Sequence, residues 1–256
     1  MDPPELTYEE HGTGKPVLLI PGTGFGASTW GQFERSLAAR RRVISYDRRG
    51  FSAAAPRPAD NMRVHADDAA SILRRAHAEP ADVIGWSAGG LVALALAIEH
   101  PTTCQSLLLI EPSVHGLLGV TPSAIAMTLR ARAIRAAGGQ RAATDFAYRW
   151  TFAYRGRKHS AWDTMPAPWR EQVLAHAAAV TAEQAHETSL RYPSRGALSA
   201  LDLPVTIVVG QRSQPYFHRI ARHLRRLLPK ARLQPIPDAS HAVHLDEPDQ
   251  VLALIA

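Results

Sequence analysis

The sequence predicts an α/β fold in which a mostly parallel central sheet is flanked by helices and carries a helical cap insertion. Three observations support it: short unbroken apolar runs, helical patterns that alternate with these runs, and a strand–turn–helix pattern around Ser87. Unbroken apolar runs are typical of strands that are covered on both faces. Strands that alternate with helices are typical of parallel sheets.

The predicted strands are short runs rich in Val, Leu and Ile, at residues 17–20, 43–46, 83–84, 107–110, 205–209 and 233–236. Helical patterns fall at residues 62–77, 88–100 and 215–228. Residues 6–10 precede a Gly-Thr-Gly turn at residues 12–14. We interpret them as an extra strand that forms a hairpin with the first run.

The alternation stops between residues 113 and 196, where no run predicts a strand. This segment is rich in Ala, Arg and aromatic residues, and we interpret it as a mostly helical insertion. The expected division is a core of residues 1–112 and 197–256 with a cap of residues 113–196. The aromatic side chains of the cap either pack within it or line an apolar pocket over the sheet.

The bulk composition fits an ordinary globular protein of one domain, with 256 residues. A single cysteine, Cys104, excludes an internal disulfide framework. The amino terminus lacks the basic and apolar regions of a signal peptide, and the longest apolar stretch, residues 91–98, is too short to cross a bilayer. We therefore expect a cytoplasmic protein with no membrane span.

The formal net charge is +6, which raises the question of nucleic-acid binding. Only three of the 29 basic residues are lysines, and the arginines are scattered over several predicted helices. Charge runs such as residues 40–42 and 222–226 are usually solvated helix faces. We expect no nucleic-acid partner.

Residues 85–90 read Gly-Trp-Ser-Ala-Gly-Gly and lie between a predicted strand and a predicted helix. A serine at the tip of so sharp a turn is held in a strained conformation, with its hydroxyl projecting from the sheet edge. The flanking residues must be small because strand and helix nearly touch. A Gly-x-Ser-x-Gly string alone is weak evidence, but this context predicts that Ser87 is a nucleophile.

A serine nucleophile needs a base, an acid that orients the base, and donors for the oxyanion. His241 follows the last predicted strand, so its loop faces the same sheet edge as Ser87, and we expect it to be the base. His244 is expected to pack or to cap a helix. No third ligand with suitable spacing accompanies these histidines, so we expect no metal site.

The oxyanion donors are expected to be backbone N–H groups of Ala88 and of the glycine-rich loop after the first central strand. Glycines let this loop approach a substrate carbonyl closely. The N–H of Thr23 is the expected donor, with Gly24 the next choice. The loop lacks the Gly-Lys-Ser/Thr ending of a phosphate-binding loop, which disfavours nucleotide binding. Gly24, Phe25 and Trp86 are the expected pocket residues.

The chain resembles the α/β-hydrolase fold superfamily over nearly all of its length outside the insertion. The matching segments follow the order of the family: residues 18–22 with Trp30 downstream, Tyr-Asp-Arg-Arg-Gly-Phe-Ser at residues 46–52, the Ser87 turn, and residues 240–248. The resemblance implies an α/β-hydrolase fold and a serine hydrolase that needs no cofactor. Pro21 stands where the family usually has histidine, which affects only the expected shape of the oxyanion loop.

The resemblance leaves the position of the triad acid open. The family commonly has an aspartate in a Gly-x-x-Asp pattern after the strand that matches residues 205–209, but this chain has Ser213 there and no carboxylate nearby. Glu111 follows the strand at residues 107–110, where some families of this fold carry their acid. Either strand end can bring a carboxylate to the back of the histidine ring. We expect Glu111 to be the acid; the alternatives are a strand cap and a pocket residue.

The sequence thus predicts hydrolysis of a carboxylic ester, lactone or thioester through an acyl-enzyme on Ser87. The apolar insertion favours a small or medium hydrophobic acyl substrate, and carboxylesterase is the leading interpretation. A cofactor-free haloperoxidase (perhydrolase) or a carbon–carbon bond hydrolase would use the same triad. A ligand-binding protein without turnover is a third class, favoured only by the serine at position 213. The oligomeric state stays unknown.

Overall fold

A single mixed sheet forms the middle layer of the protein. The computed structural model describes residues 6–52, 57–59, 61–114, 121–189 and 192–255. Within them lies a sheet of β1 (Glu9–His11), β2 (Pro16–Ile20), β3 (Arg42–Ser45), β4 (Ala81–Trp86), β5 (Cys104–Ile110), β6 (Val205–Gly210) and β7 (Ala231–Ile236). The strand order is β1-β3-β2-β4-β5-β6-β7, and every pair is parallel except β1 with β3. The predicted α/β class with a mostly parallel sheet is confirmed.

The extra strand near the amino terminus pairs elsewhere than expected. β1 runs antiparallel to β3, with Glu10 opposite Ile44, so the predicted hairpin with β2 is wrong. β2 already has β3 and β4 as neighbours, and both of its backbone edges are therefore occupied. β1 joins the sheet at the outer edge of β3, where unpaired backbone groups remain for it to bond.

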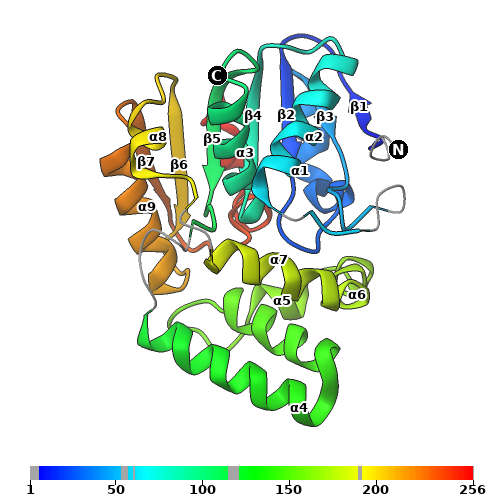
Figure 1. Ribbon diagram of the computed structural model, residues 1–256, viewed down its shortest axis with the longest axis vertical. Coiled ribbons are helices and arrows are strands. Elements are labelled where there is room, and N and C mark those ends of the chain that lie inside the picture. The colour runs from blue at the N-terminus through cyan, green and yellow to red at the C-terminus, as the bar shows by residue number, and fades with distance from the viewer. Residues whose placement is uncertain (1–5, 53–56, 60, 115–120, 190–191, 256) are drawn as a thin grey trace.

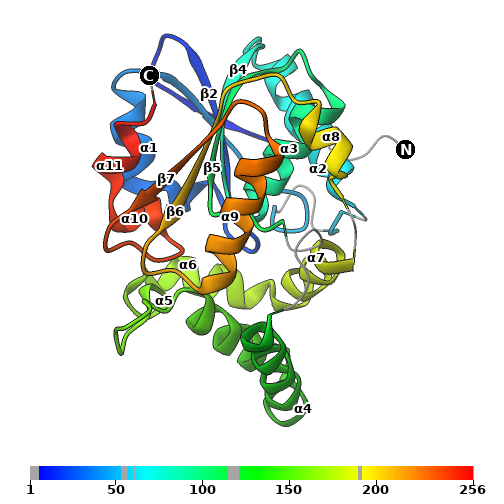
Figure 2. The same cartoon turned by 90° about the vertical axis from the view of Figure 1, so that its left-hand side faces the viewer.

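Helices cover both faces of the sheet, as Figure 2 shows. On one face lie α1 (Gly31–Ala38), α10 (Val243–Asp246) and α11 (Pro248–Leu252); on the other lie α2 (Met62–Arg75), α3 (Ala88–Glu99), α8 (Arg195–Ser199) and α9 (Pro215–Leu227). Leu18 and Ile20 of β2 belong to the core beneath α2 and α3, whereas Val17 and Leu19 belong to the core beneath α1. All four side chains are fully buried, which explains the unbroken apolar run.

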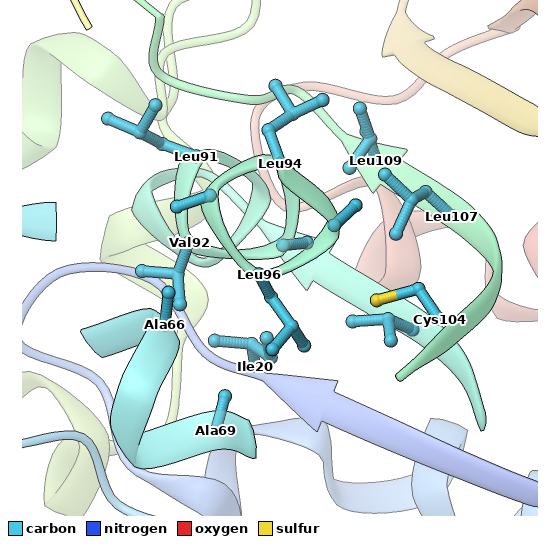
Figure 3. Close-up of a cluster of buried hydrophobic side chains, with 14 of the residues drawn as sticks. Ile20, Ala66, Ala69, Leu91, Val92, Leu94, Leu96, Cys104, Leu107 and Leu109 are labelled. Carbon is cyan, nitrogen blue, oxygen red and sulfur yellow. The ribbon is translucent and has the colours of Figure 1, made fainter. Parts of the chain in front are cut away.

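The helix α3 is apolar on every side because the sheet and α2 surround it. Its residues 88–97 are all buried. Figure 3 shows Val92, Leu94 and Leu96 of this helix in the cluster that includes Ile20 of β2 and Leu109 of β5. A helix that is apolar all round belongs in a core, and α3 is thereby held rigidly with Ser87 at its amino-terminal end. No helix among the described residues is long and apolar enough to cross a membrane.

A further helical layer lies along one edge of the sheet, below the strands in Figure 1, at the end where β5 terminates. It contains α4 (Pro122–Thr151), α5 (Ala161–Thr164), α6 (Ala167–Ala175) and α7 (Ala177–Ser189), which we call the cap helices. The helix α4 changes direction at Gly139, where φ is 81°. Tyr148, Phe152 and Trp162 from this layer pack with Phe25 from the loop after β2. Much of the aromatic content thus faces the sheet.

Part of the positive charge is used inside the fold. Arg41 is buried and pairs with Asp82 of β4, and Arg42 of β3 pairs with Glu10 of β1. The expectation of a solvated helix face is therefore wrong for these two arginines. Arg42 joins the neighbouring strands β3 and β1, whereas Arg41, just before β3, pairs with β4 on the far side of β2.

Candidate active site

The turn between β4 and α3 brings Ser87 to the edge of the sheet. Its backbone has a φ of 56° and a ψ of −119°, a strained combination for any residue with a side chain. A Cβ on Gly85 would lie 2.3 Å from the carbonyl oxygen of Gly89, and one on Gly89 would lie 2.0 Å from that of Ile20. Only glycine fits at either position, because strand, helix and β2 touch there.

Glu111 lies beside this turn at the end of the adjacent strand. Trp86 of β4 is opposite Ile110 of β5, and the N–H of Ser87 donates to the carbonyl oxygen of Ile110 at 2.9 Å. The residues that follow this matched pair are Ser87 and Glu111. Glu111 also has a positive φ, of 45°. Two strained residues side by side at a sheet edge mark a candidate functional site.

The carboxylate of Glu111 contacts the ring of His241, and both side chains are buried. Its Oε2 lies 2.8 Å from Nδ1 of His241, and its Oε1 accepts the N–H of Gly210 at 2.8 Å. Since Nδ1 is engaged by the carboxylate, Nε2 is the ring nitrogen left to accept a proton.

Aromatic rings hold His241 in place. Phe217 of α9 stacks on the imidazole with ring centroids 4.2 Å apart, and Phe152 meets it edge-on at 4.9 Å. The indole N–H of Trp86 donates to the carbonyl oxygen of His241 at 2.9 Å, which ties the loop after β7 to the residue before Ser87. Burial lowers the pKa of His241 below its usual value and so favours the neutral ring.

Ser213, in the position where the family commonly has its acid, lies near Glu111. It is fully buried, and its hydroxyl makes no hydrogen bond of good geometry among the described residues. Burial raises the pKa of Glu111 to about 8, and the nearby Ser213 hydroxyl and the N–H of Gly210 offset only part of this rise. The end of β6 thus supplies polar groups that favour a carboxylate arriving from β5.

The loop after β2 passes directly over the serine. A Cβ on Gly22 would lie 3.3 Å from the Cβ of Ser87. Thr23 is buried; its hydroxyl donates to Glu183 of α7 at 2.7 Å, and its carbonyl oxygen accepts the hydroxyl of Tyr148 at 2.6 Å. Ala88, the other expected donor, is the buried first residue of α3. The loop and the helix start therefore meet at Ser87.

The expected pocket residues gather beneath the cap helices. Gly24 has a φ of 77°, and a Cβ there would lie 2.9 Å from a methyl carbon of Val180 in α7. The ring of Phe25 lies 4.7 Å from the ring of Trp86, measured between centroids. The surroundings of Ser87 on this side are therefore apolar and aromatic.

The model of the family described as "Alpha/beta hydrolase family" matches residues 17–254. The chain belongs to this family. The α/β-hydrolase fold expected from the motifs is thereby confirmed.

This alpha/beta hydrolase is similar to several curated proteins. It is 30% identical over 256 residues to the pimeloyl-[acyl-carrier protein] methyl ester esterase of Chromobacterium violaceum, an alignment that covers 97% of the chain and 96% of the relative. It is 38% identical over 111 residues to a putative carbamate hydrolase of Azorhizobium caulinodans, where 42% of the chain and 41% of the relative are covered. The chain thus spans only about two fifths of the length of this carbamate hydrolase and of two further curated relatives.

Among solved structures, the hydrolase resembles a thermophilic esterase from Thermogutta terrifontis. The TM-score is 0.74 at 26% identity, and the match covers 98% of this chain and 91% of the esterase. Both the sheet with its flanking helices and the cap helices therefore lie within the region that matches this esterase.

The sequence does not indicate the buried charges behind the loop after β2. Arg48 pairs with Glu183 of α7, and His65 of α2 lies against the same carboxylate. Arg48 belongs to the motif at residues 46–52, yet nothing in the sequence links it to a residue in the hydrolase's cap helices. The sequence places Phe217 in a predicted helix, but nothing in it indicates that this ring stacks on His241.

No group of three or more His, Cys, Asp or Glu side chains suited to a metal ion occurs in the part of the chain that the structure describes.

Proposed function

We propose that this protein is a serine hydrolase that cleaves carboxylic esters through an acyl-enzyme on Ser87. The observation that carries the proposal is the 2.8 Å contact between Glu111 and His241 at the strand ends beside Ser87. A relative matched over 96% of its own length is a methyl ester esterase, which favours an ester as the substrate. Glu111 is the proposed acid, His241 the base and Ser87 the nucleophile.

In the acylation step, Nε2 of His241 accepts the proton of the Ser87 hydroxyl while the serine oxygen attacks the ester carbonyl. The carboxylate of Glu111 holds the ring in the required tautomer and stabilises its charged form. The negative charge on the former carbonyl oxygen is stabilised by the backbone N–H groups of Thr23 and Ala88. The tetrahedral intermediate then collapses, and the imidazolium protonates the departing alcohol.

In the deacylation step, water replaces the alcohol. His241 takes a proton from the water, whose oxygen attacks the acyl carbon, and the same N–H groups stabilise the new oxyanion. Collapse returns the proton to Ser87 and releases the carboxylic acid. One ester and one water become one acid and one alcohol.

The apolar surroundings favour a hydrophobic acyl group of small or medium size. Phe25, Trp86 and Phe152 pack together near the base, and Val180 of α7 contacts the loop at Gly24. Apolar walls with few polar groups suit an acyl chain and leave orientation to the oxyanion donors.

Hydrolysis of p-nitrophenyl butyrate by the wild type and by Ser87→Ala tests the proposal. Turnover is expected to require Ser87, and a fluorophosphonate is expected to add one phosphonyl group to the wild type alone, as read by intact-protein mass. Equal hydrolysis by both proteins would contradict the serine mechanism. Peracid formation from acetate and peroxide, or cleavage of a vinylogous diketone, without ester hydrolysis would instead favour the perhydrolase or the carbon–carbon hydrolase.

A further inference from the structure

A buried cluster of charged and polar side chains joins the cap helices to the core. Arg48 and Glu183 form a two-pronged ion pair, with Nη1 3.0 Å from Oε2 and Nη2 2.7 Å from Oε1. Arg48 is completely buried, and Glu183 is 5% exposed. Nε2 of His65 lies 3.3 Å from Oε2 of Glu183. The pair is therefore well shielded from water and from salt.

This cluster forms hydrogen bonds with the loop that passes over Ser87. Arg48 donates through Nε to the carbonyl oxygen of Pro21 at 3.0 Å, and Glu183 accepts the hydroxyl of Thr23 at 2.7 Å. The hydroxyl of Tyr148, in α4, donates to the carbonyl oxygen of Thr23 at 2.6 Å. Both peptide groups that flank the Gly22–Thr23 segment are thus anchored, and two of the three anchors come from cap helices.

Anchoring of the Gly22–Thr23 segment explains the buried charges better than a contribution to stability does. Replacing a buried ion pair by apolar residues of similar volume is often neutral or stabilising, so the pair has no advantage as mere packing. An apolar pair at these positions would leave the Pro21 carbonyl and the Thr23 hydroxyl without these partners. The ion pair therefore fixes the orientation of the Gly22–Thr23 backbone through these two hydrogen bonds.

We propose that Glu183, supported by Arg48, is a positioning residue that sets the backbone N–H of Thr23 for the oxyanion from the cap side. Loss of its hydrogen bond to Thr23 lets this segment reorient, which weakens binding of the transition state more than binding of the substrate. The inference rests on the proposed ester hydrolysis and adds to it a requirement that α7 be seated on the core.

Thr23→Val tests this point directly, because valine keeps the shape of threonine, removes the hydroxyl and leaves the Arg48–Glu183 pair in place. We expect kcat for p-nitrophenyl butyrate to fall about tenfold, less than the ~10²- to 10³-fold loss from removing a donor outright. KM should change little. The Ki of a trifluoromethyl ketone, which forms an oxyanion on Ser87, should rise by the same factor as kcat falls.

Two further variants separate positioning from structure. Thr23→Ser restores a hydroxyl and should recover most of what Thr23→Val loses. Tyr148→Phe removes the second anchor and should also lower kcat with little change in KM. The matched control is Glu171→Gln, which breaks an exposed ion pair with Arg141 between cap helices and should leave kcat, KM and Ki unchanged.

The outcomes are distinct. If the wild type shows no Ser87-dependent turnover, the proposed function fails and the inference fails with it. If the wild type is active and Thr23→Val keeps its kcat and Ki, only the inference is overturned, whatever the effect of Tyr148→Phe. A parallel rise in KM and Ki with unchanged kcat would likewise contradict it, since that pattern signals a general loss of binding.

Discussion

Oε2 of Glu111 lies 2.8 Å from Nδ1 of His241, although the two residues are 130 positions apart in the sequence. The contact is possible because β5 and β6 are adjacent parallel strands, with Ile110 opposite Val208, so both strands end at the same edge. A carboxylate at either end can reach the ring. The side chain that does so here comes from β5.

Glu111→Gln should lower kcat for ester hydrolysis by up to about 10⁴-fold, the loss seen when a triad aspartate is replaced in the serine-protease template. The glutamine amide has the same size as the carboxylate, but it carries no negative charge and therefore does not stabilise the imidazolium form of His241. Steady-state kinetics and thermal unfolding would measure activity and fold together. Ser213→Ala is the matched control, with activity expected close to wild type; near-wild-type turnover in Glu111→Gln would refute the relocated acid.

Moving the carboxylate from the end of β5 to the end of β6 offers a second test of which position can supply the triad acid. Glu111→Ser combined with Ser213→Asp should recover at least about tenfold of the activity lost in Glu111→Ser alone, because an aspartate there can orient the same ring. Ser213→Asp alone should lower both activity and Tm, since two buried carboxylates would repel each other. No recovery of activity in the double variant would mean that a carboxylate at the end of β6 does not reach the His241 ring.

The pH dependence of kcat/KM follows from the burial of His241. Burial lowers its pKa below the ordinary value of 6.5, and only the neutral ring can accept a proton. We therefore expect protonation of His241 to lower kcat/KM only at a pH below 6.5. Stability should also fall in this acid range, because the unfolded histidine binds a proton that the folded one excludes. An acid limb centred above pH 6.5 would contradict this expectation for His241 and would point to ionisation of Glu111, whose pKa is raised by burial.

Removing one partner of the buried Arg48–Glu183 ion pair should lower the stability of the protein strongly. Glu183→Ala should lower the free energy of unfolding by about 3–5 kcal/mol, because it leaves the Arg48 charge buried without its partner. Combining Arg48→Met with Glu183→Leu should regain most of this stability in urea unfolding but not the kcat. Glu171→Ala, at an exposed pair, should cost less than about 1 kcal/mol. Equal losses for the two alanine variants would argue that water reaches Arg48.

Much of the fold could be predicted because its signals are local. The Ser87 turn depends on glycines within three residues of it, and the strands that are buried on both faces show unbroken apolar runs. The partner of β1 was predicted wrongly, since pairing depends on which strand edge stays free after the sheet has assembled. A hairpin turn in the sequence cannot report that β2 is flanked on both sides.

The sequence by itself determined the strand–turn–helix around Ser87, the alternation of strands and helices, and the candidates Glu111 and His241. It left two strand ends open for the acid, because both ends of adjacent parallel strands face the same edge. Only the tertiary structure decided that Glu111 meets His241 and that Glu183 reaches Arg48 and Thr23 across the interface with the cap helices. Such contacts join residues more than a hundred positions apart, and they depend on strand register and helix packing that no short stretch of sequence encodes.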